Sequence, residues 1–135
     1  MIKLIKLWSL GMLFLLVAFV LVSFGENGNW EVPAEYKTMK NPVAGDKEGL
    51  TIAKGLYNKN CASCHGKSGL GDGPKSRTID EFPGDFSSSE FQSQTDGELF
   101  YKTSVGKGDM PKYKGKIEEE DIWLIVHYIR TFKKE

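Results

Sequence analysis

Two cysteines and a histidine stand close together in the middle of the chain, at Cys61, Cys64 and His65. In this CxxCH spacing the two thiols can bond to the two vinyl groups of a haem, while the adjacent imidazole binds the iron. Residues three apart lie on one face at the end of a helix, and the next residue can place its ring beneath the attached macrocycle. The spacing therefore predicts one covalently bound haem c.

Other uses of the two cysteines fit the surrounding sequence less well. A thioredoxin-like redox pair needs neighbouring strands, whereas the flanking residues follow helical patterns. A zinc site from Cys61, Cys64, His65 and His127 has suitable atoms, but adjacent Cys64 and His65 do not readily share one tetrahedral ion. Gly66-Lys67-Ser68 resembles the end of a phosphate-binding loop, yet the glycine required before it is Cys61 here.

The second axial ligand decides whether a haem iron transfers electrons or reacts with small molecules. Met110 is the best candidate, because it lies in a loop 45 residues after His65 and is followed by Pro111, which stiffens the loop. A core or surface methionine is the alternative interpretation. His127 is a rival ligand, but it belongs to the last helix, where we expect it to be solvated or to cap the helix.

Two amphipathic segments predict the helices that enclose such a group. Residues 48–60 carry apolar residues at helical spacing and lead directly into Cys61. Residues 117–132 carry an apolar stripe, and four acidic residues at 118–121 suit the positive end of that helix. The stripe consists of Ile122, Ile125, Ile129 and Phe132.

A third helix and a long loop complete the domain. Thr95 and Glu98 form a capping box that opens a short helix to about Val105, with Gly106 as its stop. Residues 66–94 form a glycine-rich loop, which three short helices alone enclose too little apolar area to order. We therefore expect an all-α fold of three or more short helices around one covalently attached haem.

The N-terminal residues predict a membrane segment. The 18 residues from Leu7 to Phe24 carry no charge. As a helix they would span roughly 27 Å, close to the hydrocarbon core of a bilayer. Because Lys3 and Lys6 precede the run, the positive-inside rule places the rest of the chain on the extracytoplasmic, periplasmic face of the membrane. A cleaved signal peptide, which would leave a soluble periplasmic protein, is the alternative.

The remaining chain is long enough for one domain behind a linker. We divide it into an anchor or signal segment at 1–24, a linker at 25–46 and a haem domain at 47–135. Trp30 and Tyr36 are too large for a free tether, so we expect the linker to dock partly on its own domain or on a membrane partner. With 18 Lys plus Arg and 18 Asp plus Glu, the chain lacks the basic excess of a nucleic-acid binder.

Together these features resemble the class I c-type cytochromes over about residues 48–132. The resemblance rests on CxxCH after a short helix, on Met110 followed by proline in a late loop, and on the closing aromatic helix. It implies a cytochrome c-like fold with His65 as the proximal ligand and Met110 as the distal ligand. It also implies that Tyr57 and Tyr128 meet where the first and last helices cross.

The resemblance further assigns a role to Pro74, which looks like the family's loop proline. The carbonyl of that proline accepts a hydrogen bond from the second nitrogen of the proximal imidazole and fixes the ring. The sequence departs from the family where a helix-crossing glycine is replaced by Ala53, with Gly55 two positions later. No tryptophan lies within residues 66–105 to bind a haem propionate, and Arg77 is the remaining candidate.

An iron with both axial positions filled exchanges electrons without binding a substrate, so we expect a carrier and not an enzyme. Around Met110 lie five lysines, with only Asp109 opposing them: Lys102, Lys107, Lys112, Lys114 and Lys116. This charge pattern favours docking on an acidic partner, or simply a solvated surface. An anchor favours partners in the same membrane, namely quinol-oxidising complexes and terminal oxidases. A haem subunit of a larger respiratory complex and a haem enzyme or gas sensor with an open sixth position are the alternatives.

Overall fold

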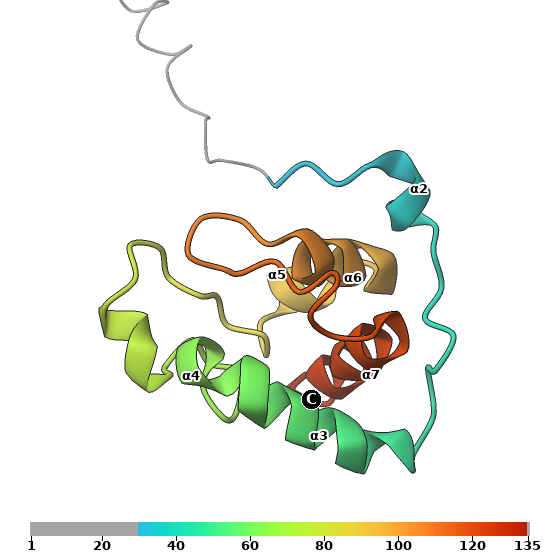
Figure 1. Ribbon diagram of the computed structural model, residues 1–135, viewed down its shortest axis with the longest axis horizontal. Coiled ribbons are helices and arrows are strands. Elements are labelled where there is room, and N and C mark those ends of the chain that lie inside the picture. The colour runs from blue at the N-terminus through green and yellow to red at the C-terminus, as the bar shows by residue number, and fades with distance from the viewer. Residues whose placement is uncertain (1–29, 135) are drawn as a thin grey trace, which may run out of the picture. The chain divides into compact units, whose positions relative to one another are not determined.

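The structure, a computed structural model, describes residues 30–134. The predicted membrane segment 1–24 and the first residues of the predicted linker lie outside the described residues. Within residues 30–134 no helix is long and apolar enough to cross a membrane. Figure 1 shows the helices, which are α2 (Ala34–Lys37), α3 (Gly49–Asn60), α4 (Ala62–His65), the 3-10 helix η1 (Pro74–Arg77), α5 (Ser89–Gln92), α6 (Asp96–Val105) and α7 (Glu119–Arg130).

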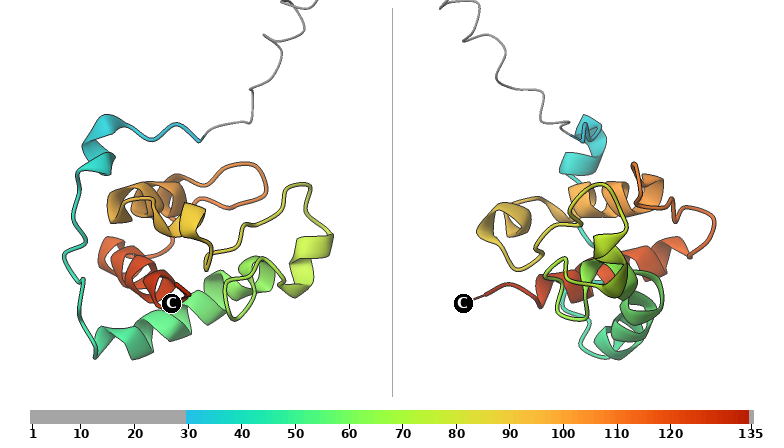
Figure 2. Two further views of the ribbon diagram at one scale, coloured as in Figure 1. Left: turned by 180° about the vertical axis from the view of Figure 1, so that it is seen from behind. Right: turned by 90° about the vertical axis from the view of Figure 1, so that its left-hand side faces the viewer.

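Helices α3 and α7 cross and pack against each other, as Figures 1 and 2 show. Ile125 and Ile129 of the predicted apolar stripe pack at this contact, and Ile125 is completely buried there. Ile122 packs instead with Leu99 and Phe100 of the later helix α6. The ring centroids of Tyr57 and Tyr128 lie 5.4 Å apart. This contact confirms the aromatic pair that the family resemblance implied.

Two small residues on α3 allow α7 to approach. Ala53 is completely buried, and Gly49 lies one turn before it. A Cβ atom on Gly49 would be 2.4 Å from Asp46 Oδ2 and 2.7 Å from Leu124 Cδ2, so a larger residue would require both side chains to move. Gly55, by contrast, faces open space. The glycine that the helix crossing uses is therefore Gly49, and its nearness to α7 could not be read from residue spacing.

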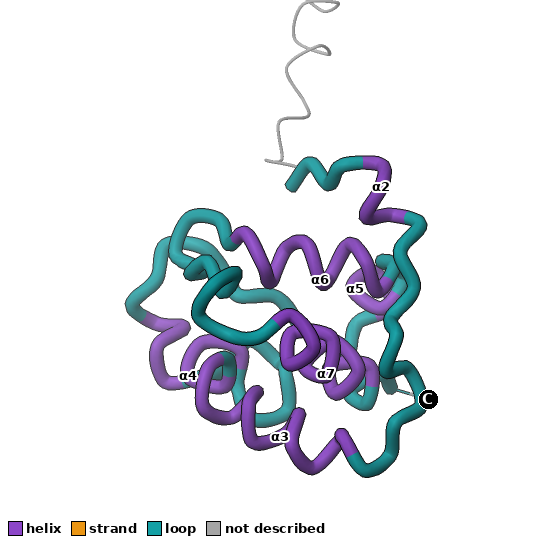
Figure 3. The backbone as a smooth tube through the Cα atoms, turned by 45° about the vertical axis from the view of Figure 1, so that its right-hand side comes forward, coloured by secondary structure: helices purple, strands orange, loops and turns teal. Residues whose placement is uncertain are grey.

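Helix α6 begins at the predicted capping box and packs on the other side of α7 (Figure 3). The backbone N–H of Thr95 donates to Glu98 Oε2 at 2.7 Å, and the N–H of Glu98 donates to Thr95 Oγ1 at 3.2 Å. The rings of Phe100 and Trp123 stack with centroids 4.0 Å apart. The capping box confirms the predicted start of this helix. Because α7 contacts both α3 and α6, it lies between them.

The described part of the predicted linker belongs to the domain, which corrects the boundary at residue 47. The compact unit begins at Val32. The ring of Tyr36 lies 4.7 Å from that of Tyr101, and the side-chain amide of Asn41 donates to the carbonyl of Trp123 at 3.0 Å. Asn41 is only 8% exposed. Large side chains thus hold residues 32–46 on α6 and α7, as their composition predicted.

Candidate functional site

The CxxCH segment forms one helical turn that directly continues α3. Cys61 is both the last cap of α3 and the first of α4, and its carbonyl accepts the N–H groups of Cys64 at 3.1 Å and His65 at 3.0 Å. Both thiols are free and partly exposed. The turn therefore places two reduced sulfurs and one imidazole next to each other, as haem attachment requires.

Most carbonyl groups at the end of this turn accept hydrogen bonds. Those of Cys64 and His65 accept the N–H groups of Gly73 at 3.1 Å and Gly71 at 2.9 Å. The carbonyl of Gly66 accepts the buried hydroxyl of Tyr57 at 2.7 Å. Because a helix end otherwise leaves such groups unpaired, these bonds fix the turn that carries the thiols.

The thiol of Cys61 and the imidazole of His65 are held in their neutral forms. Burial raises the pKa of Cys61 to about 12, and the neighbouring Cys64 adds to the rise. A catalytic redox cysteine has a lowered pKa instead, so the site does not resemble that of thioredoxin. Burial also lowers the pKa of His65 to about 4, against the opposing effect of the Pro83 backbone. A neutral imidazole keeps a lone pair for a metal ion.

The ring of His65 is positioned by stacking and by a proline carbonyl. Its centroid lies 4.4 Å from that of Phe86, which itself stacks on Phe91 at 4.4 Å. His65 Nδ1 is buried and has no hydrogen-bond partner of normal geometry. Proline carries no N–H, so the group of Pro83 that acts on the imidazole is its carbonyl.

This arrangement differs from the role predicted for Pro74. In the described residues no hydrogen bond joins His65 Nδ1 to Pro74. The loop before Pro74 packs against the backbone of α4 instead, since a Cβ atom on Gly73 would be 2.5 Å from the carbonyl oxygen of Ser63. The carbonyl near the imidazole is therefore that of Pro83, from a later part of the same loop.

Met110 lies in a tight turn that follows α6. Its N–H donates to the carbonyl of Lys107 at 2.9 Å, and its carbonyl accepts the N–H of Lys107 at 3.0 Å. Gly106 ends α6 with φ of 67°, which confirms the predicted stop. A Cβ atom on Gly106 would be 2.5 Å from the carbonyl oxygen of Met110. The turn thus rests on Gly106, and Met110 is partly exposed.

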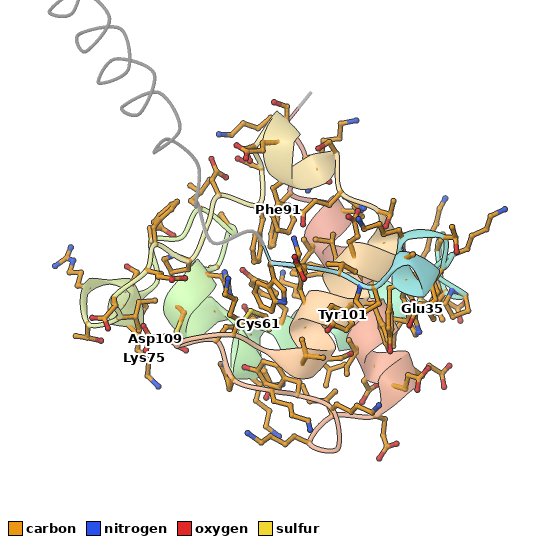
Figure 4. All side chains as sticks on the ribbon, turned by 90° about the horizontal axis from the view of Figure 1, so that it is seen from above. Glu35, Cys61, Lys75, Phe91, Tyr101 and Asp109 are labelled. Carbon is orange, nitrogen blue, oxygen red and sulfur yellow. The ribbon has the colours of Figure 1, made fainter. Side chains whose placement is uncertain are left out.

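The chain just after the Met110 turn contacts the start of the turn that carries Cys61, Cys64 and His65, which we call the attachment turn. The hydroxyl of Tyr113 donates to the carbonyl of Asn60, directly before Cys61, at 2.6 Å. The residue before Met110 makes a second contact: Asp109 Oδ2 accepts the N–H of Asp80, in the glycine-rich loop, at 2.8 Å. Figure 4 shows Asp109 on the same side of Tyr101 as Cys61, whereas Glu35 lies on the other side.

Four of the five lysines predicted around Met110 are exposed, whereas the fifth, Lys102, is not. Lys102 is half-buried and donates to Gln94 Oε1, because α6 points its side chain toward the start of that helix. The exposed ones are Lys107, Lys112, Lys114 and Lys116. Arg77, the candidate for a propionate, is also exposed.

His127 lies on α7 and is partly exposed. Its Nε2 atom is buried and has no hydrogen-bond partner, so this nitrogen neither contacts solvent nor caps the helix. Within residues 30–134 no three His, Cys, Asp or Glu side chains come together as a metal site, so the alternative zinc site with Cys61, Cys64 and His65 is not formed. The segment has no strands beside it, which also disfavours the thioredoxin interpretation.

The residues present fit a covalently attached haem c. Two free thiols lie one helical turn apart, and the next residue is an imidazole whose Nδ1 is buried without a hydrogen-bond partner. Sequence reasoning missed three residues of the site, Pro83, Phe86 and Tyr113. Pro83 had the same signal as Pro74, a proline in the glycine-rich loop, whereas nothing in the sequence singled out the other two.

Comparison with known proteins places the geometry in context. Residues 49–129 match the family of cytochrome C oxidase, cbb3-type, subunit III. A search of curated proteins gives no match. Among solved structures, the chain is similar to one from the reducing HAO-like protein complex of Kuenenia stuttgartiensis, with a TM-score of 0.62 and 21% identity. The alignment covers 85% of this chain and 57% of that one, and at this identity it shows a shared fold alone.

Proposed function

The chain belongs to the family of cytochrome C oxidase, cbb3-type, subunit III, and on this basis we propose that it transfers electrons through one covalently bound haem c. The proposal assigns Cys61 and Cys64 to the two thioether bonds. It assigns His65 and Met110 to the axial positions of the iron. The observation that carries it is the attachment turn, in which two free thiols and a neutral imidazole lie on a backbone held by hydrogen bonds from Gly71, Gly73 and Tyr57.

A haem c held in this way gains and loses single electrons without change of ligands. The protein's part is to hold the ligands still and to exclude water. Phe86 stacks on the imidazole and positions its plane, and the backbone of Pro83 raises the pKa of the ring against the larger, lowering effect of burial. A thioether ligand from Met110 raises the reduction potential relative to a second imidazole.

We also propose where the protein works and with which kind of partner. The uncharged run from Leu7 to Phe24 supports an anchor that holds the domain on the periplasmic face of the membrane, and a cleaved signal peptide is the competing proposal. The exposed lysines beside Met110 support an acidic docking surface on the partner. Quinol-oxidising complexes and terminal oxidases in the same membrane are the partners proposed.

Carbon monoxide binding distinguishes this carrier from a haem enzyme or gas sensor. The full-length protein is purified from a host that attaches haem, reduced, and exposed to carbon monoxide without denaturant. Because Met110 fills the second axial position, the absorption spectrum should stay unchanged, whereas Met110→Ala should bind the gas stoichiometrically. Rapid binding by the unchanged protein would refute methionine ligation and favour the enzyme or sensor.

A second candidate function is that of a fixed haem subunit in a larger complex. The similar solved chain comes from a protein complex, and residues 32–46 lie against the domain and do not form a free tether. Purification from its own membranes in mild detergent separates the two proposals. A free carrier should elute alone, whereas a fixed subunit should remain with other redox proteins in constant ratio.

A further inference from the structure

Tyr113 joins the loop that carries Met110 to the helix that carries the thiols. Its hydroxyl donates a 2.6 Å hydrogen bond to the carbonyl of Asn60, the residue before Cys61. The tyrosine is partly buried, and its pKa is raised to about 12 by burial and by the nearby Cys61 and Cys64. The hydroxyl therefore lies at the end of α3, where the CxxCH turn begins.

The backbone of Tyr113 is itself fixed. Its N–H donates to the carbonyl of Ser104, at the end of α6, at 3.2 Å. Its carbonyl accepts the N–H groups of Lys116 at 2.8 Å and Ile117 at 3.1 Å. The bond from the Tyr113 side chain to Asn60 thus connects the end of α3 to a loop whose backbone is hydrogen-bonded to the end of α6.

Met110 lies between this bond and a second one. Asp109 is exposed, so water competes for its bond with the backbone of Asp80. The bond of Tyr113 is partly buried and lies closer to the thiols, where competition from water is weaker. Of the two connections, the one through Tyr113 has the greater effect on the loop.

On the proposed ligation by His65 and Met110, we infer that Tyr113 is a positioning residue, whose bond to Asn60 holds Met110 in the second axial position. Because Cys61 fixes the haem to the residue that follows Asn60, this bond sets the separation between the ligand loop and the iron. Loss of the bond lets the loop open more often, and an external ligand can then replace Met110.

Imidazole competition tests this role in the oxidised, haem-loaded, full-length protein. Loss of the sulfur-to-iron charge-transfer band reports the replacement of Met110 as imidazole is added. Tyr113→Phe keeps the ring and removes the donor. One hydrogen bond changes the open fraction roughly two- to tenfold, so the variant should need roughly two- to tenfold less imidazole.

Two variants control for other causes. Tyr101→Phe removes a hydroxyl from a partly exposed tyrosine whose ring contacts that of Tyr36, and its imidazole curve should match that of the unchanged protein. Thr95→Ala removes the cap of α6 and destabilises the fold by a similar amount, yet it should leave the curve unchanged. A Tyr113→Phe curve equal to the unchanged one, or an equal shift in Thr95→Ala, would overturn the inference.

The failure of this inference is distinguishable from the failure of the proposed function. If the unchanged protein lacks the charge-transfer band, Met110 is not a ligand and the proposed function itself fails. If the band is present and Tyr113→Phe behaves like the unchanged protein, only the role of Tyr113 is wrong.

Discussion

Replacing Gly106 with alanine should displace Met110 from its position. Gly106 has φ of 67°, and a Cβ atom there would be 2.5 Å from the carbonyl oxygen of Met110 and 2.6 Å from the backbone nitrogen of Lys112. Real Cβ atoms essentially never come closer than 3.0 Å to other atoms, so the Met110 backbone must retreat by about 0.5 Å or more. On the proposed ligation, this shift would weaken the bond from Met110 to the haem iron.

The size of the effect follows from two contributions. A positive φ strains an alanine by about 1–3 kcal/mol, and the ψ of 168° places Gly106 in a region that essentially only glycine adopts. The steric overlap adds about 1–3 kcal/mol, as in other overpacked sites. Gly108 supplies the control, because its φ is 55° but a Cβ atom there would contact nothing within 4 Å. Gly108→Ala should show only the first contribution, whereas Gly106→Ala should show both.

Imidazole titration of the charge-transfer band measures the difference between the two variants. An overlap of about 1–3 kcal/mol corresponds to roughly five- to 150-fold easier replacement of Met110 in Gly106→Ala than in Gly108→Ala. Thermal unfolding of both variants shows whether the fold is retained. Equal imidazole curves for the two variants would mean that the Met110 turn does not rest on Gly106, and the account of the distal side would be refuted.

Three further predictions concern stability and are measured by thermal unfolding. Arg130→Gln should lower the melting temperature by roughly 10 °C, because about 2 kcal/mol of charge-assisted hydrogen bonds to Asp96 and the chain before α6 is lost; an unchanged value would contradict this. The carboxylate of Glu98 accepts the N–H of Thr95, which lowers its pKa, so its contribution is present above the ordinary value of 4.5 and is lost as the pH falls through the lower, folded-state pKa. Glu98→Gln should therefore be less stable than the unchanged protein at neutral pH, with a difference that shrinks in acid, and a difference that grows in acid would be the wrong sign. Gly55→Ala, at an open helical position, should raise the free energy of unfolding by about 0.5–1 kcal/mol. Gly49→Ala, at the contact with α7, should lower it by about 1 kcal/mol, and equal effects of the two variants would contradict the close approach of the helices.

Local signals in the sequence predicted the helices and the attachment turn. The capping box at Thr95 and the stop at Gly106 define α6, because both depend on neighbouring residues only. The CxxCH motif depends on chain spacing in the same way. The aromatic contact between Tyr57 and Tyr128 came from the family resemblance and is confirmed by the structure. Membership in the family of cytochrome C oxidase, cbb3-type, subunit III confirms that resemblance to the class I c-type cytochromes.

The parts that were missed depend on how distant segments meet. Pro74 and Pro83 are both loop prolines, and only the path of the chain places the second near His65. Tyr113 bonds to Asn60, which is 53 residues away in the sequence, and no local pattern encodes such a contact. His127 has a polar side chain, yet packing buries its Nε2 atom. Tertiary contacts of this kind are set by the whole core, and not by periodicity.

Intact mass is the most direct test of haem attachment through Cys61 and Cys64. The full-length protein is produced in a host that forms thioether bonds to haem, purified, denatured and measured by mass spectrometry. The account predicts a mass equal to that of the chain plus one haem, and Cys61→Ala combined with Cys64→Ala should show the mass of the chain alone. A bare-chain mass for the unchanged protein would contradict the central claim.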